Sequence, residues 1–310
     1  MRIWVDSDMG FDDLAAIGLC LSEGVKIEGL SLVAGNVALP QVLVNAMDAK
    51  DAFGWQMPLY LGAARPLRGE LQTASYVLGE SGMKTVGRHL PPARRARAPH
   101  GEALPALAEW LAKGGETVLA LGPLTNIAEF VIAYPDLAAR MRLIWMGGAF
   151  ARGNHTAVAE FNAAVDPEAI ETVLAAGVDL TMVGLECCRE VSLGLESLSD
   201  LRAQSSAGAA LIADLFEGYL RIADNGKRPM ALYDPVAAAC AIAPELFDYQ
   251  AVAMRAETEG RYCRGMTVIE WRAHKAEPNV MVALAPKAQE ITARFLRALN
   301  EMAKAYDANA

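Results

Sequence analysis

Short apolar segments alternate with segments of helical periodicity along most of this chain, and this alternation limits the possible folds more than any other feature. We expect strands at residues 3–5, 27–34, 58–61, 117–121, 143–146 and 180–184. Helical patterns lie between them, at 40–53, 102–113 and 167–175 and from residues 12 and 125 onward. Strands that are apolar throughout are typical of a parallel sheet covered on both faces. The sequence therefore predicts an α/β fold: an open, mostly parallel sheet with helices on both faces, a Rossmann-like core.

The last third of the chain follows a different pattern. A helical region at 207–223 and a helix that opens at 233–235 precede three strand patterns, at 251–257, 266–271 and 280–284. An amphipathic helix at 286–306 closes the chain. These segments predict a C-terminal β-hairpin and helix added to the parallel core. Because no linker-like stretch divides the sequence, we expect a single domain over residues 1–310.

Composition narrows the kinds of partner that this protein can have. A hydrophobic content of 53% with 21% charged residues supports a large core, and the net charge of −9 argues against binding nucleic acid or an anionic membrane. No apolar run reaches the roughly 18 residues of a membrane helix, and the first residues lack a signal or transit pattern. The five cysteines are odd in number and lack metal-site spacing, as in reduced proteins. We therefore expect a cytoplasmic protein.

Four carboxylates crowd the end of the first predicted strand. Asp6 and Asp8 directly follow it, and Asp12 and Asp13 open the next helix after a turn at Gly10. One or two of these could act as helix caps, since Asp favours the N-terminus of a helix. Four within eight positions repel one another unless a cation lies among them, and carboxylates on a tight loop suit Ca²⁺ or Mg²⁺. This stretch is the candidate active site, with capping alone as the alternative.

Other polar residues follow the later strands and should lie at the same edge of the sheet. Ligands of open α/β sheets bind outside the carboxyl ends of the strands. The residues that we expect there are Asn36, the 121–125 turn, Asn154, Glu160, Asn162, Glu186 and, if its helix starts at the same rim, Asp234. Such carboxylates and amides suit a neutral polyhydroxylated ligand beside a cation. They suit a phosphate poorly, because no Gly-rich loop with a following Lys is present. The irregular segment 63–99 is a candidate functional loop.

A set of motifs in fixed order covers almost the whole chain. In sequence these are DSDMGFDD (6–13), GN (35–36), GPLTN (122–126), MGG (146–148), AEFN (159–162), DPEA (166–169), TMVGLE (181–186) and DP (234–235). Each motif alone is weak, but the ordered set closely resembles the inosine-uridine nucleoside hydrolase family. The resemblance implies cleavage of the N-glycosidic bond of ribonucleosides, giving ribose and free base, around a bound Ca²⁺. It also implies a homodimer or homotetramer.

The resemblance assigns roles to individual residues. Asp8, Asp13 and Asp234 would be carboxylate ligands of the calcium, and the backbone carbonyl of Leu121 a further ligand. Asp8 would also be the general base for the attacking water, and Asp6 would support the site from behind or satisfy backbone amides. The ribose would be held by Asp12, Asn36, Asn154, Glu160 and Asn162. We expect Asn162 to take part in catalysis as well, and His155, which follows Asn154, to touch the substrate.

Three positions depart from the pattern that many members of the family share. Met9 stands where many have Pro, which should change the rigidity of the turn. Tyr233 stands where many have the His that protonates the leaving base, and Leu78 where many have a second His. A phenol with a pKa of about 10 is a weak acid for this role. We therefore expect ordinary ribose recognition but altered activation of the leaving base, with Tyr233 in place of the usual His.

Aromatic residues could substitute for the missing histidines by stacking on the base. The candidates are Tyr233, Tyr76, Trp271 and Tyr219. Core packing is the alternative for each, and it is the favoured interpretation for Tyr76 and Tyr219.

Two other functions are alternatives to nucleoside hydrolysis. Haloacid-dehalogenase-type phosphatases also open with a strand and Asp-x-Asp, but they need a later Lys and a late acidic pair, and the AEFN and GPLTN motifs have no place in them. A non-catalytic calcium- and ribose-binding protein of the same fold stays open, because both familiar histidines are replaced. The sequence does not identify the preferred base.

Overall fold

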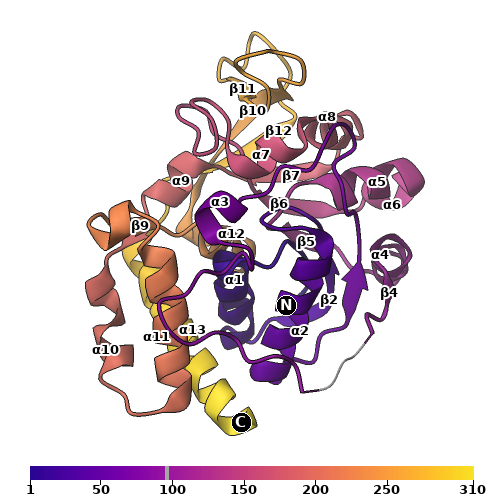
Figure 1. The fold of residues 1–310 in the computed structure, drawn as a ribbon. Helices are drawn as coiled ribbons and strands as arrows, with labels where there is room; N and C mark the ends of the chain where they lie inside the picture. The colour runs from indigo at the N-terminus through magenta and orange to yellow at the C-terminus, as the bar shows by residue number, and fades with distance from the viewer. Residues whose placement is uncertain (95–97) are drawn as a thin grey trace.

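A ten-stranded sheet forms the centre of the molecule (Figure 1), and its strands follow the order β11-β10-β12-β7-β6-β5-β1-β2-β3-β4. The computed structural model describes residues 1–94 and 98–310. The strands are β1 (Arg2–Ser7), β2 (Lys26–Leu32), β3 (Leu59–Leu61), β4 (Gly101–Glu102), β5 (Thr117–Ala120), β6 (Arg142–Met146), β7 (Asp179–Val183), β10 (Asp248–Ala256), β11 (Thr267–Glu270) and β12 (Val280–Leu284). From β12 to β4 all neighbours are parallel, and only β10 pairs antiparallel with β11 and β12. The predicted open, mostly parallel sheet is confirmed.

The chain reverses its direction of travel across the sheet between β1 and β5. From β1 it builds β2, β3 and β4 on one side, and then returns to build β5, β6 and β7 on the other. The loops after β1 and β5 therefore diverge and leave a crevice at their carboxyl ends, where open α/β sheets bind ligands. The acidic stretch after β1 lies at this reversal.

Helices cover both faces of the sheet because the buried strands are apolar on both. In β1, Ile3 and Val5 join one core cluster and Trp4 the other. Residues of α1 (Phe11–Ser22), α2 (Leu39–Ala52), α11 (Ala207–Leu220), α12 (Asp234–Ile242) and α13 (Ala288–Asn309) belong to the first cluster. Residues of α4 (Ala103–Ala112), α5 (Thr125–Ala133), α6 (Pro135–Ala138) and α8 (Pro167–Ala175) belong to the second.

The C-terminal part is built as predicted, with one addition. The antiparallel pair β10 and β11 forms the expected hairpin, while β12 lies on the other side of β10 and pairs in parallel with β7. The third strand therefore joins the hairpin to the main sheet. The closing helix α13 packs against α1 and α11.

Several short elements escaped the sequence analysis. The irregular segment contains α3 (Ser75–Leu78) and ends at β4, and the later loops contain α7 (Phe161–Val165), α9 (Leu185–Arg189) and α10 (Ser199–Arg202). A small separate sheet pairs β8 (Ser192–Leu193) with β9 (Met230–Ala231). Helices of four or five residues span little more than one turn and strands of two residues cannot alternate, so no periodic pattern reveals them.

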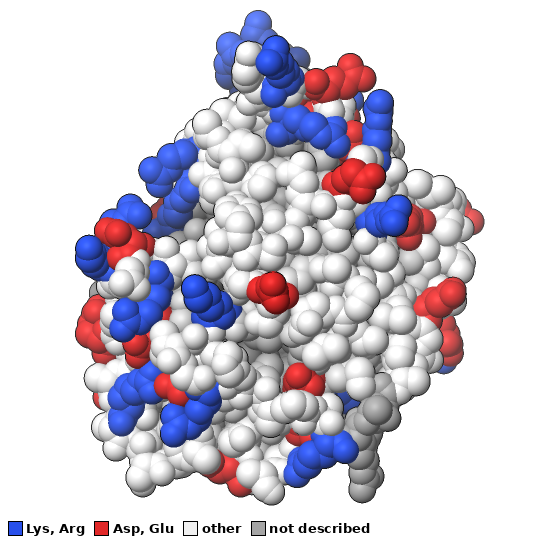
Figure 2. Space-filling model, viewed as in Figure 1, with Lys and Arg blue, Asp and Glu red and all other residues white. Residues whose placement is uncertain are grey.

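Surface charge, the state of the cysteines and the lengths of the apolar helices complete the description of the fold. Figure 2 shows Lys and Arg gathered over the β10–β11 hairpin, while the centre of this face is mostly uncharged. The five cysteines are free, four of them buried and Cys263 partly exposed. Among the described residues, no helix is long and apolar enough to cross a membrane.

The loop that leads from α3 towards β4 is fastened to α11 by Asp214. This carboxylate accepts hydrogen bonds from the Arg88 amide at 2.8 Å and from the Arg88 guanidinium at 2.9 Å, and Arg202 donates to it at 2.5 Å. Burial opposes ionisation of Asp214, but the hydrogen bonds from Arg88 and Arg202 lower the pKa of this carboxyl below its usual value.

We expect Asp214→Asn to lower the free energy of unfolding by about 1–3 kcal/mol at neutral pH, since two cations lose their buried partner. A depressed pKa stabilises the fold above the unfolded-state value and loses this effect as the pH falls through the folded-state value. The difference between variant and wild type should therefore shrink below about pH 4. Urea denaturation at neutral pH and below about pH 4 checks this prediction, with the exposed Asp200→Asn as control. An equal loss of unfolding free energy at the two pH values would contradict it.

Candidate active site

A cavity of about 240 Å³ opens at the carboxyl ends of the parallel strands. Nine of the residues predicted to bind metal or substrate or to act in catalysis line it: Asp12, Asn36, Leu121, Asn154, His155, Glu160, Asn162, Tyr233 and Asp234. They come from the loops after β1, β2, β5 and β6 and from the start of α12. Asp8 and Asp13 do not line the cavity, and they are buried beside its acidic wall. Most of the polar residues predicted to meet at this edge of the sheet therefore do so. Glu186 does not line the cavity and instead binds the amides of residues 150–152.

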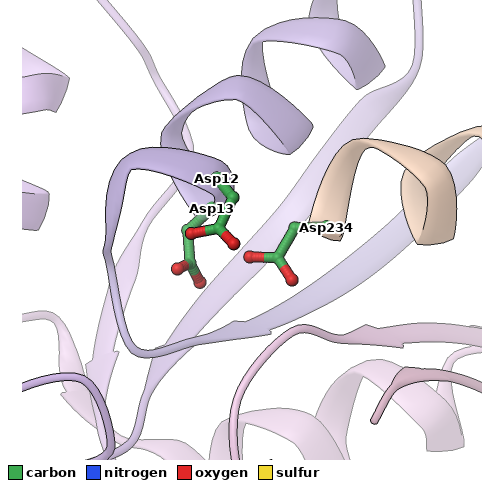
Figure 3. Close-up of side chains that lie close together, drawn as sticks. All are labelled: Asp12, Asp13 and Asp234. Carbon is green, nitrogen blue, oxygen red and sulfur yellow. The ribbon is translucent and has the colours of Figure 1, made fainter. Parts of the chain in front are cut away.

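Three carboxylates face one another at the floor of the cavity. Asp12 and Asp13 extend from the first turn of α1, and Asp234 extends towards them from the first turn of α12 (Figure 3). One oxygen of each lies within 4.8 Å of the others, a spacing that one metal ion can bridge. The crowding of Asp12 and Asp13 agrees with the prediction from the sequence. Asp12, to which the family resemblance assigns a ribose contact, also lies close enough to share a metal ion with Asp13 and Asp234.

Asp8 lies at the edge of this cluster and is held by Asn36. The Asn36 amide donates to one oxygen at 2.6 Å, and its side-chain Nδ2 donates to the other at 3.0 Å. Gly35 makes this approach possible, because a Cβ there would lie 2.1 Å from Asp8 Oδ2. The GN motif thus combines a residue without a side chain and a residue that orients the carboxylate.

Asp13 serves as a helix cap as well as a member of the cluster. Its Oδ2 accepts from the Gly10 amide at 2.8 Å, and its Oδ1 accepts from the Ser7 hydroxyl at 2.6 Å. The capping interpretation therefore holds for one of the four carboxylates. It does not account for the other three.

The acidic cluster of Asp8, Asp12, Asp13 and Asp234 lacks a counter-charge among the described residues. Burial, together with the charge of Asp13, raises the pKa of Asp8 well above its usual value and that of Asp12 to about 7. Burial and the charges of Asp12 and Asp13 likewise raise the pKa of Asp234. None of the four forms a salt bridge with a Lys, Arg or His of residues 1–94 and 98–310. Buried oxygen donors without a counter-charge fit a hard divalent cation such as Ca²⁺ or Mg²⁺.

Asp6 lies behind the cluster and contacts side chains of neighbouring elements. Its Oδ1 accepts hydrogen bonds from Ser31 of β2 and, at 2.7 Å, from Asn126 of α5. Its buried Oδ2 has no hydrogen-bond partner among residues 1–94 and 98–310, and burial raises the pKa of Asp6 to about 7. Of the two roles considered from the sequence, these contacts favour support from behind over the satisfaction of backbone amides.

Glu160 and Asn162 form a rigid wall of the cavity. Glu160 caps α7, accepting from the Asn162 amide at 2.8 Å and the Ala163 amide at 3.0 Å, and it also accepts from the Gly148 amide at 2.9 Å. Asn162 Nδ2 donates to the carbonyls of Leu121 at 2.8 Å and Met146 at 2.9 Å. With both hydrogens of its amide group committed, Asn162 can offer a ligand only its oxygen. The Leu121 carbonyl keeps one lone pair for a metal.

His155 lies in a hydrogen-bonded group with Tyr76 and Gln72 at the cavity. Of these three residues, only His155 was predicted from the sequence to touch the substrate. The Tyr76 hydroxyl lies 3.4 Å from His155 Nδ1, and Gln72 Oε1 lies 3.1 Å from His155 Nε2. Because Gln72 Oε1 can only accept, Nε2 carries the proton and Nδ1 accepts from Tyr76. Burial lowers the pKa of His155, which favours this neutral form.

Three of the aromatic residues proposed to stack on the base lie in different surroundings. Tyr76 is 70% exposed and lines the cavity, so the favoured interpretation as a core residue was wrong. Tyr219 is buried and donates to the Ala231 carbonyl at 2.6 Å, so core packing is confirmed although it borders the cavity. Trp271 packs against Phe150 with ring centroids 5.0 Å apart and does not line the cavity.

The three departures from the family pattern lie at or near the cavity. Tyr233 and Leu78 line it, and burial raises the pKa of Tyr233 to about 12. Met9 has a φ of 47°, a left-handed conformation that the ring of proline excludes. The difference at Met9 therefore goes beyond the predicted change in turn rigidity, since proline could not adopt this backbone conformation.

Apolar residues complete the cavity and were not identified from the sequence. They are Ala74, Val77, Met146, Phe161, Ile222 and Met230. Met146 and Phe161 belong to motifs that could have indicated them, whereas Ile222 and Met230 flank a polar turn without any recognisable pattern.

Solved structures share this architecture and define the class of the fold. The plant nucleoside hydrolase PpNRh1 is 28% identical to this chain with a TM-score of 0.86, covering 96% of this chain and 98% of that one. The purine-preferring ribonucleoside hydrolase of Gardnerella vaginalis has a TM-score of 0.88 over 98% of this chain and 99% of its own, at 24% identity. The fold is that of the nucleoside hydrolases.

Sequence comparison identifies the family itself. The model of the inosine-uridine preferring nucleoside hydrolases matches residues 3–293. The non-specific ribonucleoside hydrolase RihC of Salmonella agona (strain SL483) is 36% identical over 293 residues, which are 92% of this chain and 93% of that protein. The chain therefore belongs to the inosine-uridine preferring nucleoside hydrolase family. It is an enzyme of the glycosidase class that hydrolyses N-glycosyl bonds.

Proposed function

We propose that this protein hydrolyses the N-glycosidic bond of ribonucleosides in a calcium-dependent reaction that releases ribose and free base. The observation that carries the proposal is the buried carboxylate cluster at the floor of a cavity walled by amide and carboxylate groups. Hydroxyl-rich ribose suits such walls. The names of the matching relatives, ribonucleoside hydrolases, support the same activity.

The residues that would hold the calcium are the carboxylates of Asp8, Asp13 and Asp234 and the carbonyl of Leu121. When bound, the cation would lower the pKa of a coordinated water and so supply a nucleophile at neutral pH. The donor set fits, because hard oxygens are the ligands that Ca²⁺ prefers. Asp12, with one oxygen within 4.8 Å of those of Asp13 and Asp234, would accept from a ribose hydroxyl beside the ion.

Asp8 would act as the general base that removes a proton from the attacking water. Its two bonds from Asn36 fix the carboxylate while leaving further lone pairs free to accept. A positioned base of this kind contributes roughly 10²–10⁴-fold to the rate.

The ribose would be held by Asp12, Asn36, Asn154, Glu160 and Asn162. Cleavage passes through an oxocarbenium-like state, so oxygen atoms around the sugar stabilise the developing positive charge. Asn162 is suited to this catalytic role, because its nitrogen is bound to two carbonyls and only its oxygen can meet the sugar. A fixed sugar also aligns the anomeric carbon with the water.

The leaving base would meet Tyr233 and His155 at the outer part of the cavity. We expect Tyr233→Phe to lower kcat/KM about tenfold, since one hydrogen bond of roughly 1–1.5 kcal/mol to the base is lost. Steady-state kinetics with the best ribonucleoside checks this, with Tyr134→Phe, away from the cavity, as control. An unchanged kcat/KM would show that the phenol takes no part in activating the leaving base.

A free-ribose assay tests the proposed function. The purified, calcium-loaded protein is incubated with a panel of purine, pyrimidine and modified ribonucleosides, and ribose binding is measured in parallel by calorimetry. We expect ribose release from at least one ribonucleoside and none from Asp8→Ala. Ribose binding without release from any ribonucleoside would instead favour the non-catalytic calcium- and ribose-binding protein.

We further propose that residues 1–310 form one domain and that the protein is a cytoplasmic homodimer or homotetramer without a nucleic-acid or membrane partner. The continuous sheet supports the single domain. Light scattering of the purified protein distinguishes the dimer from the tetramer.

A further inference from the structure

Two side chains of α9, Glu186 and Arg189, bind a short stretch of backbone beside the cavity. The Glu186 carboxylate accepts from three successive amides, those of residues 150, 151 and 152, at 3.1, 3.0 and 3.3 Å. The Arg189 guanidinium donates to the carbonyls of Arg152 at 2.6 Å and Gly153 at 2.9 Å. The two side chains also form an ion pair at 3.9 Å. Residues 150–153 are thus held by five charge-assisted hydrogen bonds.

This stretch leads directly into two residues that line the cavity, Asn154 and His155. Asn154 Oδ1 accepts from the Phe161 amide at 2.9 Å, and the amides of residues 154–156 all point at the Ala159 carbonyl at 3.2 Å. A Cβ on Gly153 would lie 2.3 Å from the Ala159 carbonyl oxygen, so this turn is closed tightly on itself. A displacement of 150–153 would therefore move Asn154 and His155 together.

The loop has other side-chain anchors. Tyr76 and Gln72 contact the ring of His155 at its far end. Thr267 exchanges hydrogen bonds with Ala149, and Trp271 packs against the ring of Phe150. Within the described part of the chain, the side-chain hydrogen bonds to residues 151–153 come from α9 alone. The stretch that leads into the substrate-facing turn is thus held by these two side chains.

We propose that Glu186 and Arg189 are positioning residues that hold Asn154 and His155 against the ribonucleoside. The inference rests on the proposed function and adds to it, since neither side chain lines the cavity. Both side chains act through backbone groups. Glu186 uses its two carboxylate oxygens to accept from three amides, and Arg189 uses the two terminal nitrogens of its planar guanidinium to donate to two successive carbonyls.

Kinetics of Arg189→Met and Glu186→Gln test the proposal. We expect kcat/KM to fall at least tenfold, mostly through a higher KM, because contacts of Asn154 with the sugar act in the ground state as well as in the transition state. The Kd for ribose should rise by a similar factor. The kcat/KM of Arg189→Lys, whose ammonium group can reach one carbonyl at a time, should lie between the values of the wild type and Arg189→Met. Arg255→Met, which removes an exposed ion pair with Glu171 far from the cavity, is the matched control and should leave kcat/KM unchanged.

Two further measurements separate positioning from general stability. In an Asn154→Ala/His155→Ala background, Arg189→Met should change kcat/KM less than twofold, because residues that act through one another are not additive. Hydrogen exchange of the amides of residues 154–156 should be at least tenfold faster in Arg189→Met than in the wild type. Additive losses, or unchanged kcat/KM and exchange, would overturn the proposal. Absence of ribose release from the wild type would overturn the proposed function instead, and the exchange measurement would still test the hold on the loop.

Discussion

Replacing Asp8 by alanine is expected to lower kcat for ribose release by a factor of about 10³ or more, since base and metal ligand are lost together. The buried carboxylate adjoins Asp13 and is oriented by two hydrogen bonds from Asn36. No other described carboxylate bonds both the backbone and the side chain of Asn36. Another acid in the cluster would therefore not occupy the same position towards the water.

The stability of this variant distinguishes loss of chemistry from loss of fold. Removing one of several buried carboxylates that raise each other's pKa relieves repulsion, so Asp8→Ala should unfold at a Tm equal to or above that of the calcium-free wild type. Functional residues commonly cost stability in this way. A variant that loses activity together with many degrees of Tm would show that Asp8 is needed chiefly for folding.

Removal of calcium is expected to abolish ribose release and to destabilise the fold. Without a cation the cluster of half-buried Asp12 with buried Asp13 and Asp234 crowds three carboxyl groups that have no salt-bridge partner in the described residues. A ligand that binds only the folded state at 100 times its Kd stabilises it by about 2.7 kcal/mol. Thermal unfolding and ribose release with a chelator, and after re-addition of Ca²⁺, check both effects.

Asp234→Asn serves as the matched variant for this experiment. It removes one carboxylate from the cluster, so added Ca²⁺ should raise its Tm much less than that of the wild type. Mg²⁺ in place of Ca²⁺ tests the identity of the ion, since Mg²⁺ requires smaller and more regular coordination. Activity that persists in the chelator would contradict a metal-dependent reaction.

The sequence predicted the parallel core well because apolar strands and periodic helices carry strong local signals. Helix α8 and strand β12 have the predicted limits, 167–175 and 280–284. The meeting of Asp12, Glu160 and Asp234 was also predictable, because parallel strands place their carboxyl ends at one edge. The short helices were missed because four or five residues span little more than one turn and show no helical period, and the two-residue strands because they are too short to alternate.

The rest of the site depends on contacts between distant segments. The exposure of Tyr76 follows from the path of the loop that carries α3, which no repeat describes. The roles of Glu186 and Arg189 arise from hydrogen bonds to backbone more than 30 residues away, and backbone groups have no signature in a sequence. The left-handed conformation of Met9 likewise lacks the Gly or Asn that usually marks it.

The most direct test of the account is a crystal structure of the protein with Ca²⁺ and a C-nucleoside, whose carbon–carbon glycosidic bond cannot be hydrolysed. We expect one calcium ion bound by Asp8, Asp13, Asp234 and the Leu121 carbonyl. We also expect the ribose between this ion and Asn162, with the base towards His155 and Tyr233. A ribose bound away from the carboxylates, or a cluster that stays without a cation at saturating Ca²⁺, would contradict it.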